Sequence, residues 1–169
     1  MRVATLEAIA KALNEARVPF LIVGGLAVNA HGVGRFTMDL DLVIRLSPPT
    51  IHDAFSALRT LGYRPRVPIS EDDFADPDRR AGWIREKHMT VLGFHSDRHR
   101  DTPVDLFVTE PFDFDQEYAA ALVQDVAPGV PVRIVRLATL ARLKREAGRP
   151  KDLSDLSELK LLHGDLGDD

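Results

Sequence analysis

The chain opens with apolar residues at the three- and four-residue spacing of an amphipathic helix: Val3, Leu6, Ile9, Ala10 and Leu13. A continuous apolar run over residues 18–23 then predicts a short strand, which ends at Gly24 and Gly25. Residues 26–31 favour a brief helix, and residues 38–45 favour a second strand. The first quarter of the chain therefore predicts helix, strand, helix, strand.

A further amphipathic helix opens at Pro48-Pro49-Thr50 and ends at Gly62, with five apolar residues on one face: Ile51, Ala54, Phe55, Leu58 and Leu61. The following residues, 64–87, are polar and broken by Pro and Gly, which is typical of a lid or binding loop. Asp76-Pro77 favours a short helix ending near Trp83 within this segment. Phe74 and Trp83 are interpreted as its hydrophobic anchor.

The second half of the chain predicts strands at residues 89–94, 104–108 and 132–135, and helices at residues 116–123, 137–147 and 151–163. Strands are expected early in the chain and helices late. The predicted fold class is α/β (α+β), with a small mixed β-sheet, flanking helices and a C-terminal helical pair. We expect one domain over residues 1–169, in which residues 1–135 form the sheet-containing catalytic core and residues 136–169 the C-terminal helices.

Composition fits this picture, since 169 residues of which 44% are hydrophobic suit one domain with a real core. The absence of cysteine excludes disulfides and thiolate metal sites. No apolar run is long enough to cross a membrane and no segment resembles a signal peptide, so the expected location is cytoplasmic, without a membrane partner.

Charge is spread unevenly along the chain. The net charge is −4, but residues 131–151 hold seven Lys or Arg and one Glu, a local +6 that leaves −10 elsewhere. Such a run is either the solvated face of a helix or a patch that binds phosphates.

Three carboxylates carry the candidate chemistry. Side chains alternate along a strand, so Asp39 and Asp41 share one face and lie about 6.5 to 7 Å apart. Asp105 interrupts another apolar strand in the same way. Burying unpaired carboxylates is costly, so a positive partner is expected between them. Three such oxygens suit Mg²⁺, and a two-metal site needs them to steady both the attacking and the leaving oxygen.

Gly24 and Gly25 add a second element, because glycines between a strand and a helix let the backbone approach phosphate oxygens closely. No Gly-Lys-Ser/Thr follows, so this is not a P-loop, and no dinucleotide fingerprint is present. Tight packing of strand against helix would explain the glycines equally well if they stood alone.

The two elements together resemble a known signature: Gly24-Gly25, thirteen residues, then Asp39-Leu40-Asp41. This spacing resembles the nucleotidyltransferase superfamily, whose fold is that of the DNA polymerase β catalytic domain. Four further segments resemble bacterial nucleotidyltransferases related to the AbiEii toxins of abortive-infection and toxin–antitoxin systems. They are RFTMDLD, DDFADPDRRAGWIREK, VDLFV and RLKREAGRPKDLSDL.

The resemblance implies a site for an NTP and Mg²⁺, with two ions and with Mn²⁺ as a substitute. Asp39, Asp41 and Asp105 would hold the metal, and Asp105 would otherwise be the base for the acceptor hydroxyl. These acids and Lys144 are the implied catalytic residues. The implied NTP-binding residues are Gly24, Gly25, Arg35, Thr37, Lys144 and Asp155.

Several of these residues also have a structural interpretation that needs no ligand. Lys144 continues an inward helical stripe, where a lysine either snorkels to solvent or meets an anion. Asp152, which falls in the closing Lys-Asp-x-x-Asp motif, also suits the first turn of any helix. Arg35 and Thr37 either bind phosphate or cap a strand, and His31 is expected to pack near the glycines.

The sequence predicts a magnesium-dependent transfer of NMP from an NTP to an acceptor hydroxyl. The basic segment favours RNA, such as a tRNA 3′ end, over a protein or small-molecule acceptor. The resemblance adds a role as the toxin of a toxin–antitoxin system, with a cognate antitoxin protein as partner. Two alternatives stay open: a non-catalytic binding or antitoxin module of the same fold, and an Asp-x-Asp nucleotide-sugar glycosyltransferase.

Overall fold

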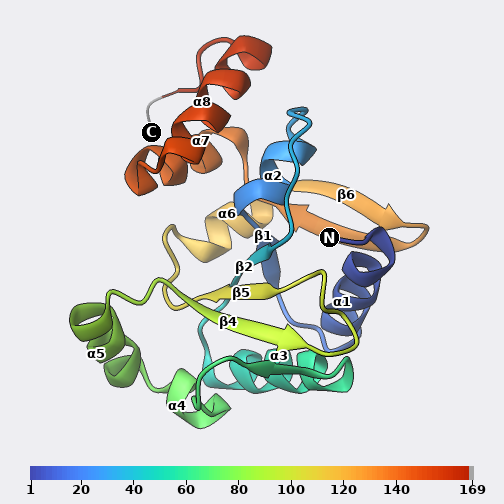
Figure 1. Cartoon of the computed structure of the whole chain (residues 1–169), viewed down its shortest axis with the longest axis vertical. Helices are drawn as coiled ribbons and strands as arrows, with labels where there is room; N and C mark the ends of the chain where they lie inside the picture. The colour runs from blue at the N-terminus through green and yellow to red at the C-terminus, as the bar shows by residue number, and fades with distance from the viewer. Residues whose placement is uncertain (168–169) are drawn as a thin grey trace.

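Seven strands form one sheet in the computed structural model, which describes residues 1–167 (Figure 1). The strands are β1 (Phe20–Ile22), β2 (Leu40–Ile44), β3 (Tyr63–Pro65), β4 (Val91–Ser96), β5 (Val104–Phe107), β6 (Leu122–Ala127) and β7 (Val130–Ile134). Their spatial order is β3-β4-β5-β2-β1-β7-β6. Two neighbouring pairs, β2–β5 and β1–β7, are parallel and the others antiparallel, which confirms the predicted α/β class with a mixed sheet.

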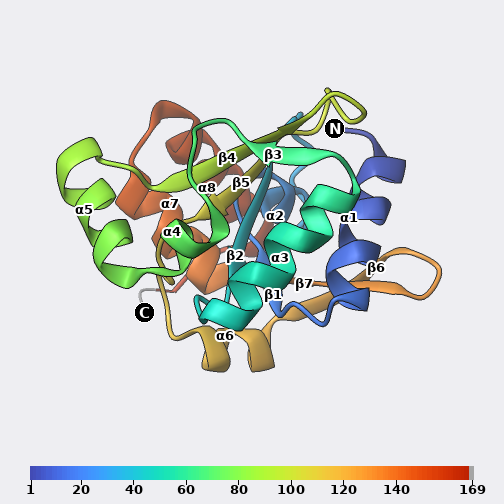
Figure 2. The same ribbon diagram turned by 90° about the horizontal axis from the view of Figure 1, so that it is seen from below.

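Eight helices accompany the sheet in residues 1–167: α1 (Val3–Glu15), α2 (Gly24–Ala30), α3 (Pro48–Thr60), α4 (Glu71–Ala75), α5 (Pro77–Lys87), α6 (Phe114–Ala120), α7 (Leu137–Ala147) and α8 (Pro150–His163). Helices α1 and α3 pack together on one face of the sheet, and α7 and α8 lie on the other (Figure 2). The predicted apolar stripes of α1 and α3 are buried against the sheet, except that Val3 is exposed and Leu61 follows α3. Within residues 1–167, no helix is both long and apolar enough to cross a membrane.

The polar segment 64–87 is more regular than predicted. It contributes the edge strand β3 and the helices α4 and α5, which begin at the capping residues Ser70 and Asp76. Phe74 is fully buried, and its ring lies 6.5 Å from that of Trp83. The predicted hydrophobic anchor is confirmed.

The prediction of a helix over residues 116–123 is wrong at its end. Helix α6 stops at Ala120, and residues 122–127 form β6, the outer strand of a hairpin with β7. Most side chains of β6 are exposed or half-buried, so no alternating apolar pattern announces the strand. The expectation that strands come early and helices late is wrong for the same reason.

The C-terminal helical pair is present as predicted. Helix α7 ends at Gly148, which adopts the left-handed conformation with φ +60°, and α8 begins at Pro150. In Figure 1 this pair, coloured orange to red, stands beside α2 and the loop that precedes β2.

Candidate active site

Asp41 and Asp105 face each other across two parallel strands in the middle of the sheet. Asp41 on β2 pairs in register with Asp105 on β5, while the flanking residues Leu40 and Leu42 are buried in the core. Asp39 lies just before β2 and is exposed to solvent. The register of β2 with β5 therefore brings two of the three predicted acids, Asp41 and Asp105, together.

Burial and mutual repulsion disfavour the charged form of both acids. The pKa of Asp41 is raised to about 6, first by burial and then by the nearby carboxylates of Asp105 and Asp39. Burial and the charge of Asp39 also raise the pKa of Asp105. A backbone hydrogen bond from Gly25 and the charge of Lys151 act in the opposite direction on Asp41. A cation between these groups would relieve both costs.

The donor set fits a hard divalent cation such as Mg²⁺. All three acids supply carboxylate oxygens and line one pocket. No three His, Cys, Asp or Glu side chains in residues 1–167 are grouped tightly enough to hold a metal ion in the present rotamers. Asp39 is exposed, so its side chain is free to turn toward the other two. Asp41 and Asp105 would provide the fixed part of such a site.

Gly24 and Gly25 are required by close approach of side chains. Gly24 has φ +64°, and a Cβ atom there would lie only 1.9 Å from Oδ2 of Asp41. A Cβ atom at Gly25 would lie 2.7 Å from Oγ1 of Thr37 and 3.4 Å from the guanidinium carbon of Arg35. The glycine pair therefore keeps open the space beside the carboxylates and the loop before β2.

Replacing Gly24 by Ala tests this close approach. We expect the variant to lose at least about 1 kcal/mol of stability from the left-handed backbone alone, and more from displacing the Asp41 carboxylate. Gly129→Ala is the matched control, because Gly129 has φ +74° but nothing within 4 Å of its Cβ position. Thermal unfolding should show a larger loss for Gly24→Ala, and equal losses would contradict the role assigned to Gly24.

Lys144 is buried, with 5% of its surface exposed, and its ammonium group lies between two carboxylates. Its Nζ is 3.1 Å from Asp152 and 2.6 Å from Asp155. Asp155 also accepts a hydrogen bond of 2.6 Å from Arg35, and Asp152 one of the same length from Arg149. The inward lysine meets anions of its own chain, and α7, α8 and the loop before β2 are tied together by this ion network.

Arg35 and Thr37 lie against Gly25. The backbone N–H of Arg35 donates to Asn29 at 3.0 Å, and the Thr37 hydroxyl donates to the carbonyl of Asp39 at 3.4 Å. These contacts fix the entry to β2. The side chains of Arg35 and Thr37 also line the pocket that contains the three acids. Their contacts at the start of β2 are therefore compatible with a place in the candidate site.

Two pockets meet at the carboxylates. A polar pocket of about 270 Å³ is lined by Gly24, Gly25, residues 35–39 and Lys151 among others. A pocket of about 470 Å³ with a mainly apolar wall runs between β4, β5 and α7. Both are lined by Gly24, Asp41, Asp105, Lys144, Arg149 and Asp152. Lys151 was not assigned a role from the sequence, although it opens the Lys-Asp-x-x-Asp motif that could have pointed to it.

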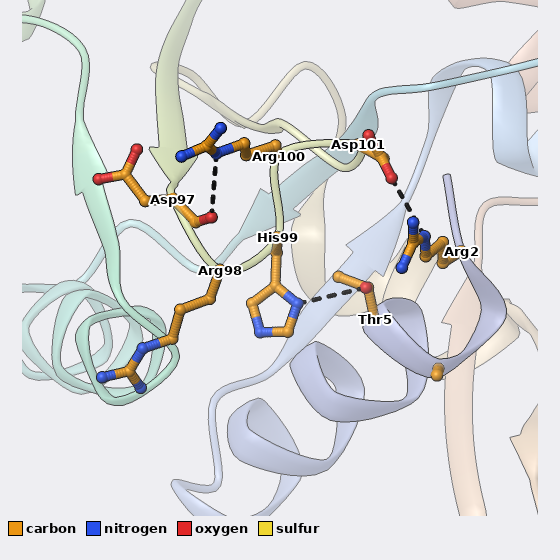
Figure 3. Close-up of a pocket in the computed structure, with 8 residues that line it drawn as sticks. Arg2, Thr5, Asp97, Arg98, His99, Arg100 and Asp101 are labelled. Atoms are coloured by element: carbon orange, nitrogen blue, oxygen red, sulfur yellow. Dashed lines mark hydrogen bonds and ion pairs between the residues drawn. The ribbon is translucent and has the colours of Figure 1, made fainter.

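A third hollow, of about 490 Å³, contains none of the predicted site residues (Figure 3). It lies at residues 97–101 and the start of α1, where Arg2 pairs with Asp101 and His99 with Thr5. The ring of His99 also stacks on Tyr63 at 5.8 Å. His99 therefore has a structural role here, and His31 likewise has a structural contact, a hydrogen bond of 2.8 Å with the carbonyl of Val135.

The mixed α/β fold is shared with solved structures that include a nucleotidyltransferase. The antibiotic-resistance factor ANT(2'')-Ia, an aminoglycoside nucleotidyltransferase, has a similar solution structure, with a TM-score of 0.61 and 18% identity over 96% of this chain and 84% of that one. Its crystal structure in complex with adenylyl-2''-tobramycin gives a TM-score of 0.55 and 17% identity, covering 96% and 89%.

JHP933 from Helicobacter pylori is also similar, with a TM-score of 0.54 and 16% identity, covering 96% of this chain and 66% of JHP933. No protein-family model and no curated protein sequence matches the chain. At these identities the comparisons establish the fold, and they do not establish the AbiEii-related subtype.

Proposed function

We propose that this protein is a magnesium-dependent nucleotidyltransferase that moves NMP from an NTP to an acceptor hydroxyl and releases pyrophosphate. The observation that carries the proposal is the register of Asp41 with Asp105 beside the Gly24–Gly25 pair in one polar pocket. The shared fold of ANT(2'')-Ia, whose crystal structure holds adenylyl-2''-tobramycin, supports it.

Several residues of the polar pocket would together bind the NTP. The open space at the glycine pair admits phosphate oxygens, while Lys151 brings positive charge and Thr37 a hydroxyl donor, and Arg35 lies beside them in its ion pair with Asp155. Lys144 and Asp155 act on this site by fixing Arg35 and α8. Bound at Asp39, Asp41 and Asp105, Mg²⁺ would neutralise charge on the reacting phosphate. In the alternative role, Asp39 and Asp41 would hold the metal and Asp105 would accept the proton of the acceptor hydroxyl, since Asp105 lies where the two pockets meet.

Contacts in the structure weaken the argument that the positive charge of residues 131–151 favours an RNA acceptor. Arg133 lies over the ring of Tyr118, Arg136 pairs with Glu117, and Arg142 pairs with Glu146. Lys144 and Arg149 are engaged by Asp152. Most cations of residues 131–151 thus have partners within the chain, so we propose a small-molecule acceptor in place of RNA. The toxin role and a cognate antitoxin protein stay predictions.

Incubation with each α-labelled NTP, Mg²⁺ and total RNA, protein or small alcohols tests the proposal. We expect magnesium-dependent transfer of labelled NMP to an acceptor with release of pyrophosphate, abolished by EDTA. Nucleotide binding without turnover under every condition would instead favour the non-catalytic module. Activity with nucleotide sugars but not with NTPs would favour a glycosyltransferase.

A further inference from the structure

The two pockets leave the carboxylates in opposite directions along the strands. Asp41 and Asp105 are in register, and the polar pocket continues toward Asp39, two residues earlier on the same chain segment as β2. The larger pocket continues toward Phe107, two residues later along the parallel strand β5. Since each residue of a strand advances about 3.3 Å, the two pockets open on opposite sides of the acid pair.

The directions of the two pockets can be compared with the geometry of phosphoryl transfer. The attacking oxygen and the leaving oxygen lie roughly in line on opposite sides of the phosphorus. On the proposed function, pyrophosphate leaves from the polar pocket, where the glycine pair, Arg35 and Lys151 lie. The attacking hydroxyl then has to arrive from the side of Phe107, through the larger pocket.

The wall of the larger pocket is chemically distinct from that of the polar one. Seven of its residues are apolar: Val23, Val91, Phe107, Pro111, Leu140, Leu143 and Ala147. Apart from Asp41 and Asp105, the charged residues that line it have partners, since Glu146 pairs with Arg142 and Asp152 with Lys144 and Arg149. Its volume of about 470 Å³ falls in the range of pockets that enclose small ligands.

We propose that this pocket binds the acceptor, and that the acceptor is a small alcohol with an apolar, ring-sized body. The apolar body packs against α7 and Phe107, and the hydroxyl points inward to Asp105. The hydroxyl oxygen attacks the α-phosphorus, its proton passes to Asp105, and the bond to pyrophosphate breaks. This assignment rests on the proposed function, which it deepens by naming the acceptor class.

Ala147→Trp provides the test, because Ala147 is exposed at the last residue of α7 and lines the pocket, so a large ring there fills the pocket without disturbing the core. Ala119→Trp is the matched control: Ala119 is an exposed helical alanine of α6 that lines neither pocket. The probe is 2-phenylethanol, and its binding is measured by saturation-transfer NMR in the presence of Mg²⁺ and a non-hydrolysable NTP. NTP affinity is measured separately by calorimetry.

We expect the wild type and Ala119→Trp to bind the probe, and Ala147→Trp to bind it at least about 10-fold more weakly with NTP affinity unchanged. No binding to the wild type, or equal binding to Ala147→Trp, would overturn the proposal. A loss of NTP affinity in Ala147→Trp would assign the pocket to the nucleoside instead and would also overturn it. Failure of the proposed function looks different, because then the wild type releases no pyrophosphate with any acceptor, whether or not it binds NTP.

Discussion

Asp41→Asn is expected to lower NMP transfer by about a thousandfold or more while making the metal-free protein more stable. The carboxylate lies beside Asp105 on the neighbouring strand, and burial and repulsion raise its pKa to about 6. An amide of the same shape removes this cost but cannot serve as an anionic metal ligand. Activity and stability should therefore change in opposite directions.

The gain in stability should depend on pH. The ordinary pKa of Asp41 is 3.8 and its folded pKa is about 6, so the folded state binds the proton more tightly than the unfolded state. The wild type therefore loses stability relative to Asp41→Asn as pH rises from about 4 to 6, and the difference levels off above that range at up to about 3 kcal/mol.

Denaturant titrations of both proteins in EDTA, from pH 4 to 8, measure this difference. Asp125→Asn is the control, since Asp125 is an exposed residue of the edge strand β6 and should change neither activity nor stability. Unaltered magnesium-dependent transfer by Asp41→Asn would contradict the metal assignment. A destabilised variant with no pH dependence would contradict the electrostatic account of the site.

Lys144→Met should destabilise the fold by about 3 to 5 kcal/mol, because it leaves two buried carboxylates without their shared ammonium group. Asp152 and Asp155 are 1% and 5% exposed. Arg149 and Arg35 remain as partners on their outer sides. For a chain of this size, such a loss lowers the melting temperature by about 10 °C.

Arg142→Met is the matched control for this prediction. Arg142 lies on the same helix and pairs with Glu146 at 2.8 Å, but Glu146 is exposed, so its loss should cost less than about 1 kcal/mol. Thermal unfolding of the two variants makes the comparison, and similar changes in both would show that the buried network adds nothing to stability. Lys144→Arg keeps the positive charge. A lower NTP affinity of this variant with unchanged stability would indicate a direct contact between Lys144 and phosphate.

Patterns that depend on near neighbours in the chain determined much of this protein from the sequence. The stripes of α1 and α3 follow from the helical period. Strand alternation predicted a shared face for Asp39 and Asp41, although Asp39 lies just before β2. The pair Gly24–Gly25 marked the tight turn from β1 into α2, and the inward stripe of α7 indicated that Lys144 either snorkels to solvent or meets an anion. Each of these features is local, so a short stretch of sequence specifies it.

Only the tertiary structure decided which distant residues meet. The register of β2 with β5 sets Asp41 opposite Asp105, and the packing of α8 on α7 gives Lys144 its two carboxylates. Strand β6 escaped prediction because an exposed edge strand depends on pairing with its neighbour and needs no apolar alternation. The apolar pocket between β5 and α7 had no counterpart in any single segment, because its walls come from strands and a helix that folding alone brings together.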